Sequence, residues 1–233
     1  MFVNPFKWKH YEGEIILLNV RWYLKYSLSF RNLKEMMAER RVIVDHTTIM
    51  RWIHQYSSEI EKKIRKHLRP TNDSWKVDET YIRVKGKWKY LYRAVDSKGD
   101  TIDFMLSSKR NKKAAKKFLQ KALSFNHNQM PKVITVDKNP AYPHAIDKLK
   151  NDKILPKNVG IRQIKYLDNI IEQDHRSIKR IVNPMLGFQS FRSANKILKG
   201  IEAMNMIKKG QINDLYSNLN EVKYINQLFG IVL

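Results

Sequence analysis

Three acidic residues occupy positions at which a carboxylate calls for a chemical explanation. Asp78 lies in the middle of an alternating stretch and shares its face with Thr80, Ile82 and Val84, so it is turned toward an apolar layer. A buried carboxylate without a partner is costly, so Asp78 requires a counter-charge such as a cation. Asp137 directly follows an apolar run, at the kind of strand end where open α/β sheets bind their ligands.

The third acid, Glu172, lies near the start of a predicted helix whose N-cap would be Asp168. Glu172, His175, Arg176 and Lys179 are spaced i, i+3, i+4 and i+7, which predicts that all four share one helix face. A carboxylate with basic and polar neighbours on one face is typical of a metal ligand beside a phosphate-binding track.

Each acid also has a simpler explanation. Asp78 fits an acid at a strand edge, and Asp137 fits the turn and cap that open the next helix. Glu172 and Arg176 fit an exposed i,i+4 ion pair worth a few tenths of a kcal/mol. These alternatives account for any single acid, but they account poorly for all three acids at these spacings.

The elements that position these acids follow from the change in periodicity after residue 74. Alternating, β-branched and aromatic residues predict three antiparallel strands at 75–84, 88–95 and 101–106. The remaining elements are predicted as a helix at 112–125, a buried strand at 133–136, a helix at 141–150, a strand at 161–166 and a helix from about residue 169. This order resembles that of an α/β ribonuclease H-like domain.

The first seventy residues are predicted to be helical. Apolar spacing predicts a helix from Glu14 to Tyr26, Ser29 is a suitable N-cap for a second helix, and Asp45 is a suitable N-cap for a third. Two short helices joined by a turn match the helix-turn-helix layout, in which the start of the second helix meets base edges. The expected DNA contacts are His46, Thr47, Thr48 and Arg51. A plain helical bundle is the alternative.

Composition favours a polyanionic partner. The 233 residues include 45 Lys and Arg against 22 Asp and Glu, which gives a net charge of +23, and no basic tail accounts for it. The chain contains no cysteine, which excludes disulfides, cysteine nucleophiles and thiolate zinc sites. No apolar run is long enough to span a bilayer and no signal peptide opens the chain, so we expect a cytoplasmic, nucleoid-associated protein without a membrane partner.

The spacing of the acids and the strings around them resemble a known family. Asp137 follows Asp78 by 59 positions, and Glu172 follows Asp137 by 35. The surrounding strings are WKVDETYIRVKGKWKYLYRAVD at 75–96, VITVDK at 133–138, KYLDNIIEQDHR at 165–176 and GIEAMNMIKKG at 200–210. The pattern resembles the Asp-Asp-Glu triad of polynucleotidyl transferases and, in its local strings, the small DDE transposases of the IS-six insertion-sequence family, with an integrase-like catalytic core. Residues 211–233 match no part of this pattern.

This resemblance implies a two-metal mechanism on DNA. Asp78 would bridge two Mg²⁺ ions, for which Mn²⁺ substitutes, while Asp137 and Glu172 each hold one. Lys179 matches a basic position that contacts DNA near the scissile phosphate, and His175 and Arg176 are further candidates for phosphate contact. The family likeness also implies recognition of terminal inverted repeats, joining to target DNA by a replicative cointegrate route, and a homodimer or larger assembly on double-stranded DNA.

The predicted organisation is a helix-turn-helix DNA-binding domain at 1–70, a ribonuclease H-like catalytic domain at 71–182 and a C-terminal helical segment at 183–233. Two alternatives come from other classes of protein. One is a stand-alone ribonuclease H-like nuclease that cuts without joining, and the other is a non-catalytic DNA-binding repressor.

Overall fold

The chain folds into two units that are best described separately. The computed structural model describes residues 5–164, 169–213 and 220–231. One compact unit comprises residues 69–179, and the other combines residues 1–68 with 180–233. The C-terminal segment is therefore part of the same unit as the N-terminal helices. The unit boundaries lie within three residues of the positions predicted from the sequence, while the functions assigned to the three segments stay predictions.

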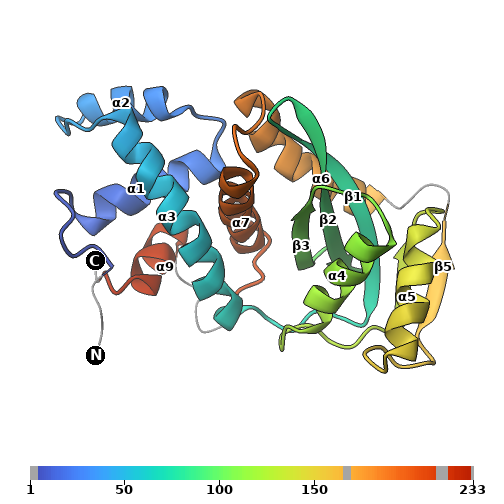
Figure 1. Ribbon diagram of the computed structural model, residues 1–233. Helices are drawn as coiled ribbons and strands as arrows, with labels where there is room; N and C mark the ends of the chain where they lie inside the picture. The colour runs from blue at the N-terminus through green and yellow to red at the C-terminus, as the bar shows by residue number, and fades with distance from the viewer. Residues whose placement is uncertain (1–4, 165–168, 214–219, 232–233) are drawn as a thin grey trace. The chain divides into compact units, whose positions relative to one another are not determined.

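The unit of residues 69–179 is built around a five-stranded sheet (Figure 1). Its strands are β1 (Ser74–Val84), β2 (Lys87–Asp96), β3 (Thr101–Ser107), β4 (Val133–Val136) and β5 (Gly160–Gln163), in the order β3-β2-β1-β4-β5. The first three strands pair antiparallel, whereas β1–β4 and β4–β5 pair parallel. This strand order, with helices after the third, fourth and fifth strands, is that of the predicted ribonuclease H-like fold.

Helices cover both faces of this sheet. On one face, α4 (Lys112–Leu123) and α5 (Ala141–Asn151) pack over the main apolar core, which includes Trp75, Val77 and Phe118. On the other face, α6 (Asn169–Val182) meets the sheet through Asp174 and His175, which contact β2 and β1 respectively. Alternation along β1 therefore sends neighbouring side chains to two different environments.

Two predicted boundaries differ from the structure. The strand predicted at 161–166 begins at Gly160 and ends at Gln163, and its predicted last residue, Tyr166, lies outside the described residues. The helix predicted to end at Phe125 ends at Leu123. Ser124 caps its C-terminus, and the Ser124 hydroxyl donates a hydrogen bond to the Lys121 carbonyl. Asp168, the expected N-cap of α6, also lies outside the described residues.

The other unit is helical (Figure 1). Its helices are α1 (Gly13–Lys25), α2 (Phe30–Ala38), α3 (His46–Ile64), α7 (Phe191–Lys208) and α9 (Glu221–Leu228), with short 3-10 turns at Arg65–His67 and Asn183–Met185. α3 packs against α1, α2, α7 and α9. The predicted apolar stripe of α3 is fully buried and consists of Ile49, Trp52, Ile53 and Tyr56. No helix of the described residues combines the length and apolar character that a membrane span requires.

The predicted N-caps are present. Ser29 and Asn32 form a reciprocal capping box at the start of α2, and the Asp45 carboxylate accepts the Thr47 amide at the start of α3. The segment 39–45 that joins the two helices is longer than the three or four residues of a standard helix-turn-helix. The N-terminal part of α3 is nevertheless presented to solvent, with Thr47 and Arg51 exposed and His46 and Thr48 half-buried.

The tail that matches no family string completes this helical unit. The Glu221 carboxylate, at the start of α9, forms ion pairs with two residues of α1, Arg21 at 3.1 Å and Lys25 at 2.7 Å. Phe229 is buried and its ring lies 5.8 Å from that of Phe6 and 5.9 Å from that of Tyr56. Residues 220–231 therefore contribute to the core of the unit.

Replacing Asp45 with Ala is expected to lower the melting temperature, because α3 loses the acceptor for its first turn. Hydrogen bonds from the Thr47 hydroxyl and amide lower the pKa of Asp45 to about 2, from an ordinary value of 3.8. A carboxyl group with a lowered folded-state pKa stabilises the fold above its unfolded pKa and loses that effect as the pH falls through the folded value. The deficit of Asp45→Ala should therefore be full above about pH 5 and shrink toward pH 2.

Thermal melts of wild type, Asp45→Ala and Asp45→Asn across this pH range measure the effect. Asp45→Asn is the matched control because it keeps an acceptor oxygen but carries no charge. A melting deficit of Asp45→Ala that stays constant from pH 5 to pH 2 would contradict the assignment of the carboxylate as the cap.

Candidate metal centre

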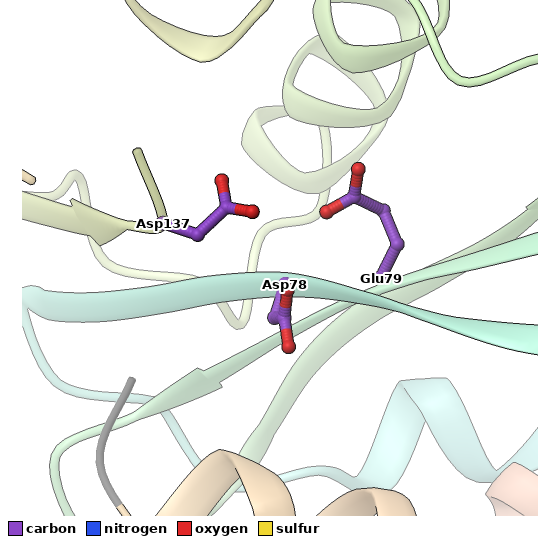
Figure 2. A group of neighbouring side chains, drawn as sticks. All are labelled: Asp78, Glu79 and Asp137. Atoms are coloured by element: carbon purple, nitrogen blue, oxygen red, sulfur yellow. The ribbon is translucent and has the colours of Figure 1, made fainter. Parts of the chain in front are cut away.

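The sheet brings two of the predicted acids together. β1 and β4 pair parallel with Val77 opposite Val136, so the residues that follow, Asp78 and Asp137, lie side by side. Oxygens of Asp78, Asp137 and a third acid, Glu79, all lie within 4.8 Å of one another. Figure 2 shows the carboxylates of Asp137 and Glu79 turned toward each other on one side of β1, and the Asp78 side chain extending to the other side of the strand. The assignment of Asp78 and Asp137 as metal ligands stays a prediction.

Asp78 is a half-buried carboxyl group beside two other acids. Its side chain is 25% exposed, and burial raises its pKa to about 7. The carboxylates of Glu79 and Asp137 raise this pKa further, while a backbone hydrogen bond from Glu79 and the charge of Arg110 oppose the rise. Two neighbouring negative charges in a half-buried site are what a bound cation would compensate.

Glu79 is the member of this group that the sequence analysis missed. Its side chain is 1% exposed, and both of its oxygens accept hydrogen bonds. Arg110 Nε donates to Oε1 at 2.6 Å, Asn139 Nδ2 lies 3.4 Å from the same oxygen, and the Tyr142 hydroxyl donates to Oε2 at 2.6 Å. The carboxylate is therefore held by protein partners on the face of the sheet that α5 covers.

A signal for Glu79 was available in the sequence. Alternation along β1 puts it on the same face as Trp75 and Val77, the face that an amphipathic helix must cover. An acid on a core face requires a positive partner. The identity of that partner, Arg110, was not accessible, because it lies 31 positions away in the segment before α4.

Arg110 connects Glu79 to Asp137. Its Nη2 donates to Asp137 Oδ2 at 3.1 Å while its Nε is bound to Glu79. The other Asp137 oxygen accepts the amide of Asn139 at 3.0 Å. Asp137 is thus oriented from two sides, by the guanidinium and by the turn that leads into α5, and its side chain keeps 24% exposure.

Glu172, the third predicted ligand, stands apart from this group. Its side chain is 60% exposed and pairs with Arg176 at 3.0 Å, which is the simpler alternative considered for these two residues. His175, three positions further along α6, has its Nδ1 3.8 Å from Asp78 Oδ2. Glu172 therefore belongs to the helix that approaches Asp78, and its own part in the site stays a prediction.

His175 does not share the face of Glu172, Arg176 and Lys179. It is 5% exposed and belongs to the buried face of α6 together with Ile171, Asp174 and Ile178, whereas the other three side chains are exposed. Burial lowers the pKa of His175 to about 3, and the charge of Arg93 lowers it further against the opposing effect of Asp174. An uncharged, buried imidazole argues against the predicted phosphate contact.

Two of the predicted DNA-contacting side chains at the start of α3 interact with the N-cap residue, Asp45. The Thr47 hydroxyl donates to Asp45 at 2.6 Å, and His46 Nδ1 lies 3.3 Å from the same carboxylate. Arg51 is exposed one turn further along. A negative cap among these groups lowers the positive potential of this end of the helix, so a role in DNA contact for His46, Thr47, Thr48 and Arg51 stays a prediction.

The donor set fits a hard divalent cation. Carboxylate oxygens from β1 and from the end of β4 converge, and neither thiolate nor charged imidazole is present among them. Burial, with the carboxylates of Glu79 and Asp137 beside it, makes the negative charge of Asp78 costly, and a cation bound there would offset this cost. Asp78 and Asp137 are better suited to hold the ion than Glu79, since their side chains are 25% and 24% exposed while that of Glu79 is 1% exposed.

Comparisons with known proteins identify the family to which the chain is similar. A family model described as a DDE domain matches residues 72–211. The chain is 37% identical over 208 residues to the transposase for insertion sequence-like element IS431mec of Staphylococcus aureus (strain N315), with 89% of this chain and 90% of the relative covered. It is 36% identical over 208 residues to the transposase for insertion sequence element IS257 in transposon Tn4003 of Staphylococcus aureus, with the same coverage.

A solved structure of the HTLV-2 integrase catalytic core domain in complex with magnesium, in its dimeric form, is 18% identical, with a TM-score of 0.44 and coverage of 57% of this chain and 85% of that chain. The family model spans more than half of the chain, and the identity to the curated relatives extends over nearly all of it. These two matches show that the chain belongs to the DDE transposases of the IS-six insertion-sequence family.

Proposed function

We propose that this transposase nicks DNA at the terminal inverted repeats of its element and joins the freed 3′ ends to target DNA. The observation that carries the proposal is the parallel pairing of β1 with β4, which places the Asp78 and Asp137 carboxylates together inside the segment that matches the DDE domain. A net charge of +23 supports binding to DNA, and such binding weakens steeply with salt.

The proposed metal ligands are Asp78, Asp137 and Glu172, with Mg²⁺ as the ion and Mn²⁺ as a substitute. Bound ions of this kind activate the attacking oxygen and stabilise the leaving oxygen of a phosphodiester. Glu172 supports this assignment because it is exposed, one turn from the residue that approaches Asp78, and held only by an exposed pair with Arg176. Releasing that pair costs a few tenths of a kcal/mol, roughly the worth of an exposed i,i+4 pair.

The chain's own residues orient the reaction. Arg110 and the Asn139 amide fix the Asp137 carboxylate, so its lone pairs are directed before any substrate arrives. Asp78 is held on β1, where it pairs with Arg93 of β2 one residue beyond the stretch that pairs with β4. Arg176 and Lys179, exposed on α6 beside Glu172, are the proposed contacts for the phosphates next to the cut, and the N-terminal helices are the proposed readers of the inverted repeats.

Two DNA ends must be brought together before they are joined to a target. We therefore propose that the protein acts as a homodimer or larger assembly on double-stranded DNA, and that joining proceeds by the replicative cointegrate route. We also propose that the protein is located in the cytoplasm and associates with the nucleoid.

A strand-joining assay in Mg²⁺ tests the function. Labelled DNA that carries the repeats flanking the reading frame is incubated with wild type and with Asp78→Asn, and products are separated on a denaturing gel. Joined product from wild type alone supports the proposal. Cleavage without joining would instead indicate a stand-alone nuclease. Binding to the repeats without any metal-dependent product would indicate a DNA-binding repressor.

A further inference from the structure

The hairpin of β1 and β2 extends beyond the acids and exposes large aromatic rings. Trp88 is 61% exposed and Tyr81 is 49% exposed, although both lie within regular strands. Tyr81 is opposite Tyr90, and Arg83 is opposite Trp88, so the four side chains lie on one face of the hairpin. The Tyr81 ring lies 6.2 Å from the Trp88 ring, edge to face, and 5.5 Å from the Tyr90 ring. We call Tyr81, Arg83, Trp88 and Tyr90 the aromatic face.

This exposure contrasts with the rest of the same sheet face. Trp75, Val77 and Tyr92 are at most 1% exposed, and Glu79 is also buried. The helices that cover those residues do not cover Tyr81 and Trp88, which leaves two large rings in water at the free end of the hairpin. Exposed aromatic side chains that gather in one place mark a surface that binds a partner.

The positive charge around these rings indicates which kind of partner they bind. Arg83, Lys85, Lys87 and Lys89 lie within seven consecutive residues, and no acid occurs anywhere from residue 80 to residue 95. Arg83, Lys85 and Lys87 are exposed. Cations interleaved with aromatic rings suit a strand of nucleic acid, because the cations bind phosphates and the rings stack on bases.

The aromatic face is continuous with the acid site. Tyr81 follows Glu79 on the same face of β1, and Arg110 bridges Glu79 and Asp137. At about 3.3 Å per residue, the four positions from Glu79 to Arg83, which share one face of β1, span about 13 Å. A DNA strand advances about 3.4 Å per nucleotide, so the aromatic face begins next to the acids and reaches about four nucleotides away.

We propose that the aromatic face binds unpaired nucleotides of the DNA strand next to the scissile phosphate, by stacking bases on Trp88 and Tyr81. Unpaired nucleotides are favoured over duplex because the faces of paired bases are already covered by their neighbours in the stack. This inference rests on the proposed function for the position of the DNA, and it adds that the strands are separated beside the cut.

Binding measured without divalent metal tests the inference independently of catalysis. Two fluorescently labelled DNA ends are compared in EDTA: one fully paired, and one with five mismatched nucleotides next to the cleavage position. Wild type should bind the mismatched end more tightly. Trp88→Ala should weaken binding to the mismatched end about tenfold and leave the paired end nearly unchanged, in keeping with the loss of one base–aromatic stack. Trp88→Phe should restore most of the difference.

Trp8→Ala is the matched control, because Trp8 is 86% exposed, has a lysine over its ring and lies in the helical unit. It should bind both DNA ends as wild type does. Equal affinity of wild type for the two ends, an equal loss on both ends in Trp88→Ala, or no binding of either end would each overturn the inference. A change in oligomeric state of Trp88→Ala, measured by light scattering, would overturn it in favour of a contact between copies of the chain. Mismatch-dependent binding by a wild type that joins no DNA would leave the inference standing and refute the proposed function.

Discussion

Glu172→Gln is expected to lower DNA strand joining by about a thousandfold or more while leaving the stability of the protein unchanged. Removing a metal ligand from a two-ion site costs several kcal/mol of transition-state stabilisation, and each 1.4 kcal/mol is about a factor of ten in rate. The side chain is 60% exposed and its partner Arg176 is 73% exposed, so the folded state loses only an exposed ion pair, worth roughly 0.5 kcal/mol or less. A gel assay of strand joining and a urea unfolding curve measure the two effects.

Glu79→Gln is the informative comparison, because the structure places this acid, and not Glu172, within 4.8 Å of Asp78 and Asp137. Its carboxylate is bound by Arg110, Tyr142 and Asn139, so Glu79→Gln should destabilise the fold. It should also reduce strand joining, but far less than Glu172→Gln does. The reverse pattern, with joining abolished by Glu79→Gln and retained by Glu172→Gln, would assign the third ligand to Glu79.

The comparison of Glu79 with Glu172 also shows which features of the site can be predicted from the sequence. Strand periodicity placed β1 to β4 correctly, and the apolar run before Asp137 predicted that this acid follows a buried strand, as it does at the end of β4. Such predictions succeed because they depend on local patterns and on the rule that parallel strands end at a common edge.

The contacts of Glu79 could not be predicted from local sequence patterns. Its partners come from residues 31, 60 and 63 positions away, and their convergence depends on how α4 and α5 pack. For α6, helical spacing gave the relative angles of the side chains but not which face is buried. Polar residues occupy the buried face, where Asp174 and His175 lie between Ile171 and Ile178, so the apolar pattern was diluted and His175 was assigned to the wrong face.

The buried polar pair that holds α6 against the sheet supports a second large prediction. Arg93 on β2 is 0% exposed, and its Nη2 lies 2.6 Å from Asp174 Oδ2 on α6, which is 3% exposed. Arg93 is opposite Asp78 in the β1–β2 register, so this pair anchors the helix beside a proposed metal ligand. Breaking a buried ion pair from one side leaves an uncompensated charge in a low-dielectric site.

Arg93→Met is therefore expected to reduce the free energy of unfolding by about 3–5 kcal/mol. Arg176→Met is the matched control, since it makes the same change on the exposed face of α6 and removes only the pair with Glu172, worth about 0.5 kcal/mol or less. Urea unfolding followed by circular dichroism compares the two variants. A loss below 1 kcal/mol in Arg93→Met would contradict the anchoring role.

The double variant Arg93→Met/Asp174→Leu separates the charge effect from loss of packing. With both charges replaced by apolar groups of similar size, no buried ion is left unpaired, and a large part of the lost stability should return. Strand joining should follow stability, falling in Arg93→Met and returning in the double variant, because α6, which carries Glu172, again packs on β2. Recovery of stability without recovery of joining would show instead that the Arg93–Asp174 pair sets the orientation of α6 in a way that apolar packing does not reproduce.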